Sequence, residues 1–336
     1  MLQFEGEGRW LAVMALTALA ELVWWVVSWS RGIAPAPFLG TYLVFAGVGL
    51  GGACAMRLVA GKPAMHARWP IVLLGTLLVV IGASLFLPLK FAIPRQLPFW
   101  FDGSLASAER AVLGRDAWAL LDPVLGPAIR PIDWLYGLWV PVQALVLFVV
   151  MLGPPSPAKS RVLIAYALAW FVLGVAAAAL FSSAGPIFYD RVFGGDRFAA
   201  LTDMLHRRGA WVVLAESDAM WASHLAPRPG LVAGISAFPS LHVAISLWIY
   251  FAARETAPRA APIALGYFMF MWIASVQLGW HYVSDGLGAL IGMLLLWALA
   301  AWLDRKLTSI NAARGESDAQ VVPATLSRPA RVDLHL

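Results

Sequence analysis

The sequence predicts an all-α integral membrane protein, a polytopic bundle of about eight transmembrane helices. Of its 336 residues, 61% are hydrophobic and only 13% are charged, and the mean hydropathy is +0.75. Soluble chains carry about 25% charged residues. Apolar runs near or above the ~18 residues that span a bilayer recur along the whole chain. Most Lys and Arg residues lie between these runs and form no basic cluster with aromatic residues, so no nucleic-acid partner is expected.

Segments rich in proline, glycine or charge separate the apolar runs and place the expected spans. Glu21 lies inside the first span. A lone carboxyl is costly in lipid, so it should face the bundle or a wet cavity, either as a hydrogen-bonded packing residue or as a catalytic group. Pro141 should kink the fourth span. The eight expected spans cover residues 10–30, 38–60, 69–89, 132–152, 162–182, 237–253, 262–277 and 282–303.

Two long segments between the spans, 90–131 and 183–236, combine proline with mixed charge and should lie outside the membrane. In the first, short interfacial helices are expected around 105–121. Residues 1–303 would thus form one integral membrane domain, with the catalytic motifs concentrated in 160–303. Residues 304–336 are polar and are expected to form a disordered cytoplasmic tail.

The basic residues of the short loops indicate the orientation of the bundle. Loops 57–68, 154–161 and 254–259 and the start of the tail carry Lys and Arg, whereas the loop between the first two spans carries only Arg31. By the positive-inside rule, both termini are expected in the cytoplasm. The two long segments would then face the periplasm or the outside of a bacterial inner membrane.

His281 and Asp285 begin the last apolar run. Residues four apart share one face of a helix. A carboxylate at Asp285 would accept the Nδ1–H of the imidazole, fix its tautomer and leave Nε2 free as a nucleophile toward phosphorus. The alternative is a hydrogen-bonded pair with a structural role alone.

A second polar stretch, Ala-Phe-Pro-Ser-Leu-His at 237–242, opens the sixth run. Pro239 and Ser240 are typical of a helix start, where free N–H groups bind anions. Ser240 would contact phosphate oxygens, and His242 would protonate the leaving oxygen as general acid. Alternating spans bring this stretch to the same membrane face as His281. The alternative is a capped membrane helix with an interfacial histidine.

Pro-Ser-Leu-His followed by His-Tyr-x-x-Asp resembles the second and third signature motifs of the type 2 phosphatidic acid phosphatase superfamily. Leu241, in place of the commoner Gly, and Ser-Ala-Gly-Pro-Ile-Phe-Tyr at 183–189 look more like the inositol phosphorylceramide synthase (inositolphosphotransferase) branch. The resemblance covers about residues 160–303. It implies a six-helix catalytic core, His281 as nucleophile, Asp285 as its orienting partner, His242 as general acid, and catalysis without a metal or other cofactor.

The chain departs from the phosphatase branch in two places. The first motif, Lys, six residues and Arg-Pro, is not found, and Ala274-Ser275 stands where the third motif has Ser-Arg. Because phosphoryl transfer develops negative charge, other donors must take their place. Each candidate has the alternative of packing or snorkelling at the interface. The candidates are Arg191, assisted by Tyr189, then Lys90 and Arg95, and Gln277 one turn before His281.

These features predict a phosphotransferase that moves a phosphoryl or phospho-head group between lipids through a phosphohistidine. The donor would be a lipid phosphate or phospholipid, and the acceptor a hydroxylated lipid, a polyol or water, with membrane lipids around the protein. The main alternative is a lipid phosphate phosphatase acting on phosphatidic acid or a polyprenyl diphosphate. A transporter or a catalytically silent scaffold is a third possibility, although no internal repeat is evident. No Cys/His or carboxylate cluster has metal-ligand spacing, so no metal is expected.

Overall fold

The computed structural model describes residues 6–33, 37–61, 69–227 and 234–321, with the side chains of 310–321 left out. Within these ranges every regular element is a helix, which confirms the all-α polytopic fold. Six helical segments are long and apolar enough to cross a membrane. They are α1 (Gly8–Ser30), α2 (Leu39–Val59), α3 (Trp69–Gln96), the continuous α8–η3–α9 (Pro157–Leu180), η4 with α14 (Pro258–Gln277), and the first part of α15 (Val283–Val321).

The fourth expected span is broken into two pieces. Helix α6 (Ile129–Gly137) ends where α7 (Trp139–Met151) begins, and the chain bends there by 41°. Pro141 explains the break, because it has no N–H for the carbonyl of Gly137 four residues before it, and its ring crowds that carbonyl. If the bent pair counts as one span, the described residues contain seven candidate spans rather than the eight expected.

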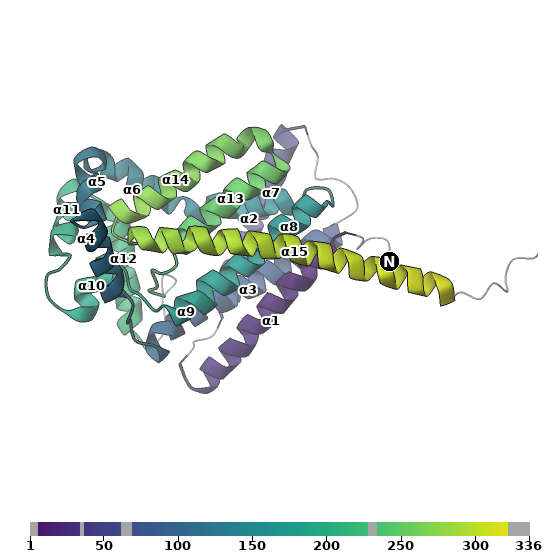
Figure 1. Ribbon diagram of the computed structural model, residues 1–336, viewed down its shortest axis with the longest axis horizontal. Coiled ribbons are helices and arrows are strands. Elements are labelled where there is room, and N and C mark those ends of the chain that lie inside the picture. Colours follow the sequence, from purple (N-terminus) through teal and green to yellow (C-terminus); the bar gives the residue numbers. More distant parts are fainter. Residues whose placement is uncertain (1–5, 34–36, 62–68, 228–233, 322–336) are drawn as a thin grey trace, which may run out of the picture.

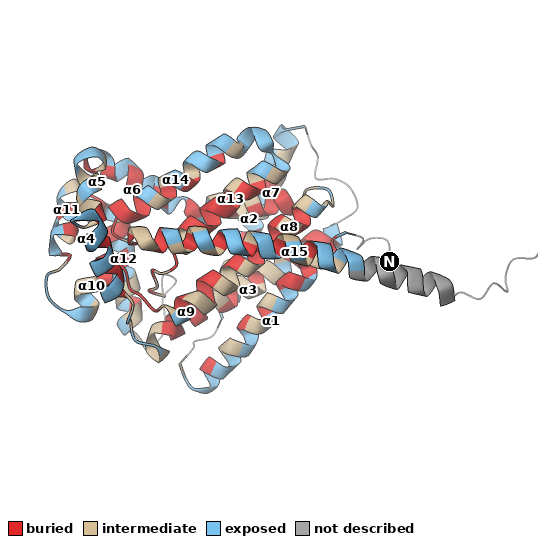
Figure 2. Ribbon diagram, in the orientation of Figure 1, coloured by how far each residue is buried: buried red, intermediate tan, exposed pale blue. Residues whose placement is uncertain are grey.

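The remaining expected span corresponds to α13 (Leu241–Thr256), which has only 16 residues. This is shorter than the ~20 residues that cross a bilayer. Helix α13 packs against α7, α8, α14 and α15, and Trp248 at its centre is completely buried. It therefore forms the middle of the bundle (Figure 2), where neighbouring helices rather than lipid surround it.

Two helices extend beyond their expected ends. Helix α3 continues to Gln96, so Lys90 and Arg95 lie in its last two turns and not in an extramembrane segment. Helix α15 runs without a break past residue 304 to Val321, where a disordered tail was expected. The rest of that expected tail, 322–336, lies outside the described residues.

The two long segments both fold into short helices at one end of the bundle. Figure 1 shows these helices together, at the end away from the N-terminus, as the alternation of spans predicted. Ion pairs tie them to one another, Arg197 to Asp116 at 2.6 Å and Arg208 to Asp122 at 2.9 Å. The helices are α4 (Asp102–Leu113), α5 (Ala117–Leu125), η2 (Gly126–Ala128), α10 (Pro186–Phe193), α11 (Ala199–Arg208) and α12 (Trp211–Leu225).

At the opposite end of the bundle, ion pairs connect the helices. Lys159 Nζ lies 2.8 Å from Glu7 Oε1, and Arg9 Nε lies 3.3 Å from Asp304 Oδ1. These contacts join the starts of α1 and α8 to the middle of α15. Around the bundle, large apolar side chains are exposed, among them Val48 at 70%. Such a surface suits lipid rather than water.

Candidate active site

His281 and Asp285 form the centre of the site at the start of α15. The Nδ1 of His281 lies 3.2 Å from Asp285 Oδ2, and both side chains are buried. His281 precedes the helix rather than sharing a helical face with Asp285. Asp285 Oδ2 also accepts the N–H of Tyr282 at 3.0 Å, the reciprocal half of a capping box. The Asp285 carboxyl therefore lies where it can orient the imidazole, although the contact crosses the start of the helix and does not lie on one helical face.

The second histidine lies beside the first. Ser240 is the N-cap of α13, since its hydroxyl oxygen accepts the N–H of Val243 at 3.3 Å. His242 follows in the first turn, with its ring centroid 6.1 Å from that of His281 and 4.2 Å from Trp139. The N–H of Ser240 donates to the backbone oxygen of Asp285 at 3.1 Å, so it is not free for phosphate as expected. The Ser240 hydroxyl only accepts in its bond with Val243, so its own O–H can still donate to a ligand.

A three-residue loop, Ser183–Gly185, joins the two histidine loops. The carbonyl oxygen of Ser183 accepts the N–H of Ala237 at 2.8 Å, and Ile187, just beyond the loop, donates its N–H to the carbonyl of Gly279 at 2.9 Å. Gly185 has φ of +88°, and a Cβ there would lie 2.4 Å from the carbonyl oxygen of Trp280. Only glycine allows this close approach. The Ser-Ala-Gly-Pro stretch is therefore a brace between the two motifs.

Two buried carboxyls of α4 hold this arrangement from outside. Asp102 accepts the N–H groups of Ala184 at 2.7 Å and Gly185 at 2.8 Å, and the hydroxyl of Tyr282 at 3.3 Å. Burial raises the pKa of Asp102, while the two backbone N–H groups act to lower it. Glu109 accepts the N–H of Val283, the first residue of α15, at 2.8 Å. Sequence analysis missed both residues, because they belong to no motif and lie far from the histidines along the chain.

Lys90 is the cation that the structure brings to the histidines. Its side chain is buried, and its charge acts on the imidazoles of both His242 and His281. Its Nζ lies 5.9 Å from the centroid of the Phe86 ring. Among the described residues it has neither a carboxylate partner nor a hydrogen bond. A buried ammonium without a counter-ion is costly, and an anionic ligand would offset that cost.

Two other predicted cations are engaged elsewhere. The Nη2 of Arg191 lies 2.6 Å from Asp218 Oδ1 on the exposed surface of α10 and α12. Arg95 Nη2 donates to the carbonyl oxygens of His224 at 2.7 Å and Ala226 at 2.6 Å, at the end of α12. Both arginines therefore connect outer helices, and among the described residues neither makes a hydrogen bond or ion pair with His242 or His281.

The two predicted neutral donors have different surroundings. Tyr189 is half-buried, with its ring centroid 5.3 Å from that of Phe198. Gln277 is completely buried at the end of α14, and its Nε2 and Oε1 have no hydrogen-bond partner among the described residues. The hydroxyl of Tyr136 and Nε1 of Trp139, both beside His242, are likewise unpartnered. These unused polar atoms are available to a ligand.

The surroundings of His281 keep its imidazole neutral. Burial lowers its pKa to about 3, with the positive charge of Lys90 acting in the same direction and the backbone of Ala237 acting against it. A neutral imidazole has the free lone pair that a nucleophile needs. Within the described parts of the chain, no group of three His, Cys, Asp or Glu side chains has the geometry to hold a metal ion.

Comparison with models of protein families matches residues 114–299, just over half of the chain, to the PAP2 superfamily. The chain belongs to the PAP2 superfamily. The resemblance drawn from Pro-Ser-Leu-His and His-Tyr-x-x-Asp is thus confirmed at the level of the superfamily. The matched PAP2 region holds both histidine loops and the brace, but not α1 to α3, and so not Lys90. Searches of curated proteins and of solved structures gave no match.

Proposed function

We propose that this PAP2 protein is a membrane-embedded phosphotransferase. It moves a phosphoryl or phospho-head group between lipid substrates through a phosphohistidine at His281. The observation that carries this proposal is the buried His281–Asp285 pair beside His242 and the unpaired Lys90. Together they provide a nucleophile, its orienting carboxyl, a proton donor and a positive charge for phosphate oxygens.

In the first step, the Nε2 lone pair of His281 forms a bond to phosphorus, and the bond from phosphorus to the leaving oxygen breaks. Burial and the charges of His281 and Lys90 lower the pKa of His242 to about 3, so His242 takes up a proton only when the anionic phosphate lies beside it, and it then gives that proton to the leaving oxygen. Asp285 stabilises the positive charge that His281 acquires, through its contact with Nδ1. Lys90 faces the negative charge on the phosphoryl oxygens, as cationic clamps do in other phosphoryl transfers.

In the second step, the hydroxyl of the acceptor gives its proton to His242 and its oxygen bonds to phosphorus. The bond from phosphorus to Nε2 breaks, and its electrons return to the imidazole. The enzyme is restored with His242 protonated again. A lipid or polyol hydroxyl gives transfer, and water gives hydrolysis.

Burial of the centre supports transfer over hydrolysis. His281 is only 5% exposed, and Ser240 and Gln277 are completely buried. A site that limits water favours another nucleophile in the second step. The Ser-Ala-Gly-Pro stretch, which resembles the inositolphosphotransferase branch, supports the same reaction. The alternative, a lipid phosphate phosphatase, is the activity that the superfamily suggests most directly.

The same proposal places the enzyme in a bacterial inner membrane, with its termini in the cytoplasm and the histidines toward the periplasm. The basic residues of the short loops support this orientation. A cysteine at position 320 should then react with an impermeant label only after cells are opened. Labelling of intact cells would reverse the orientation.

The test is turnover by the purified protein in detergent. Lipid phosphates and phosphodiester lipids are supplied with or without diacylglycerol, ceramide or inositol, and mass spectrometry follows phosphate and new lipids. We expect an acceptor-dependent product that is unaffected by EDTA and falls by about 10⁴-fold or more in His281→Ala. His206→Ala, an exposed histidine on α11, is the matched control. Phosphate release without an acceptor product would favour the phosphatase, and turnover that survives His281→Ala would overturn the mechanism.

A further inference from the structure

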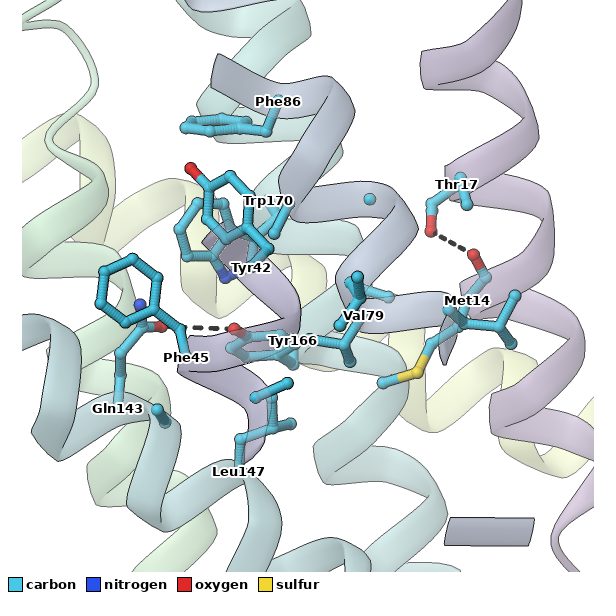
Figure 3. A pocket seen from close by; sticks show the side chains of 18 of the residues that line it. Met14, Thr17, Tyr42, Phe45, Val79, Phe86, Gln143, Leu147, Tyr166 and Trp170 are labelled. Atoms are coloured by element: carbon cyan, nitrogen blue, oxygen red, sulfur yellow. Dashed lines mark hydrogen bonds between the residues drawn. The ribbon is translucent and has the colours of Figure 1, made fainter. Parts of the chain in front are cut away.

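A cavity of about 320 Å³ lies inside the bundle among α1, α2, α3, α7 and the α8–η3 segment. This volume is at the lower end of the range of ~300–1,000 Å³ that is typical of small-molecule sites. We call it the chamber (Figure 3). Its walls are mostly aliphatic and aromatic, and none of the described residues that line it is Lys, Arg or His. The lining comes from residues 14–21, 42–46, 78–86, 140–148 and 166–170.

Glu21 is the one acidic side chain that lines the chamber. It is 3% exposed, and its Oε2 has no hydrogen-bond partner among the described residues. A Cβ at Gly82 would lie 3.3 Å from this oxygen, so the carboxyl lies directly against the backbone of α3. A buried carboxyl without a partner is costly in a membrane protein, and a hydrogen-bond donor on a ligand would offset part of that cost.

The wall also contains a neutral pair of polar side chains. The hydroxyl of Tyr166 donates to Oε1 of Gln143 at 3.3 Å (Figure 3). Because the lining has no cation, a phosphate group would find no counter-charge there. The chamber therefore suits an uncharged ligand that is largely hydrocarbon and carries a hydroxyl or amide.

One layer of aromatic rings separates the chamber from the catalytic centre. Phe86 and Trp170 contact edge to face with centroids 4.7 Å apart, and Trp170 lies 6.0 Å from Trp139. Trp139 in turn contacts His242, while Lys90 follows Phe86 by one turn of α3. Two ring contacts, with centroid distances of 6.0 and 4.2 Å, thus connect Trp170 in the chamber wall with His242.

Three of the walls come from helices outside the matched region, since α1, α2 and α3 all precede residue 114. The catalytic loops belong to the matched region. The chamber is therefore built where these N-terminal helices meet that core, and it is a place where this chain can select its own substrate.

We infer that the chamber binds the head end of the uncharged acceptor lipid, because about 320 Å³ is too small for a whole diacylglycerol. The adjoining hydrocarbon would lie against the apolar walls, and the hydroxyl or amide would be hydrogen-bonded to Glu21. The inference rests on the proposed function, because only transfer needs an acceptor other than water. In this arrangement the acceptor is held behind Phe86 and Trp170 before it reaches His242.

The test is direct binding, measured without turnover. The probe is a diacylglycerol that carries a diazirine in one acyl chain, compared with the same molecule acetylated at its hydroxyl. After irradiation, peptide mass spectrometry should find the label on residues 14–21, 78–86 or 140–148. We expect wild type and Glu21→Gln to prefer the free hydroxyl by about tenfold, the effect of one hydrogen bond, and Glu21→Leu to lose that preference.

Two further variants separate the chamber from the chemistry and from the outer surface. Ala83→Phe fills the chamber and should abolish labelling, whereas Leu77→Phe, at an exposed position of the same helix that does not line it, should not. Labelling that persists in His281→Ala supports the chamber even if turnover is lost. Absence of label from the chamber, an equal preference in Glu21→Leu and wild type, or a preference for an amine in place of the hydroxyl would overturn the inference.

Discussion

Each end of the bundle contains a buried lysine, and the two lysines differ in whether a carboxylate lies beside them. At one end Lys159 is 4% exposed and lies 2.8 Å from Glu7. At the other end Lys90 is 9% exposed and has no carboxylate among the described residues. The first lysine completes a pair that joins α1 to α8. The second acts on two histidines and lies in a site with several unpartnered polar atoms.

The two lysines illustrate the difference between a buried charge that stabilises the fold and a buried charge that is a candidate for binding a ligand. A buried pair can be satisfied within the protein, and breaking it leaves one uncompensated ion. A buried charge without a partner is a cost that a ligand can relieve, and such sites are candidates for function. The buried carboxyls of the site, Asp102, Glu109 and Asp285, each accept a backbone N–H group. We therefore expect the substrate phosphate to supply the anion.

Replacing each lysine by methionine tests this difference. Of the variants compared below, Lys90→Met should have the largest effect on turnover. Lys90→Met should lower kcat/KM by about 10²–10³-fold, the effect of losing one donor to transition-state charge, without lowering the melting temperature. It should also raise the pKa of His281 toward its ordinary value, so that the acidic limb of kcat/KM moves to higher pH. A phosphodiester donor should be used, because a monoester titrates near pH 6.

Lys159→Met is the matched control for that experiment. It removes the ion-pair partner of the buried Glu7 carboxylate, which should cost about 3–5 kcal/mol of stability. The kcat of the folded fraction should stay unchanged. The comparison between the two ends fails if Lys90→Met only destabilises the protein, or if Lys159→Met slows turnover by the folded fraction.

An intermediate effect should follow from Asp102→Asn. An amide has one acceptor oxygen, so the N–H of either Ala184 or Gly185 loses its partner and the brace shifts. A misplacement of about 1 Å at a catalytic group can cost about 10²-fold, so kcat should fall by up to that factor while KM changes little. A purely structural role would lower the melting temperature and leave kcat of the folded protein intact.

The smallest effect should come from Arg191→Ala. Its ion pair with Asp218 is partly exposed, with side-chain exposures of 31% and 67%. Such pairs contribute about 0–1 kcal/mol to stability. Turnover should stay within about twofold of wild type, because solvent-exposed charges far from the reacting group are screened. If Arg191→Ala lowered turnover as much as Lys90→Met, Arg191 would be the residue that contacts the substrate phosphate, as was expected from the sequence.

The features that could be predicted from the sequence are those determined by residues close together along the chain. Apolar runs gave the spans of α1, α2 and α14. The short spacing placed His281 near Asp285, although their contact crosses the start of α15 and does not lie on one helical face. Serine before an apolar run gave the cap at Ser240. These features depend on hydropathy, on helix geometry or on backbone chemistry within a few residues.

Features that depend on tertiary contact could not be predicted in this way. Lys90 was given second place behind Arg191, because the helix end was expected at residue 89 and burial could not be seen. Asp102 lies 180 positions before its partner Tyr282, so no spacing rule connects them. The break at Leu138 lies three residues before the expected kink, because a proline disturbs the turn that precedes it.

The brace at Ser183–Gly185 has a consequence for the membrane in which the enzyme works. The spans tilt when the bilayer becomes thicker or thinner. The two histidine loops are linked through this segment by hydrogen bonds of 2.8 and 2.9 Å, and not only by the packing of long helices. Their separation is therefore set locally, so changes in lipid composition that tilt the outer helices should leave the distance between His281 and His242 almost unchanged.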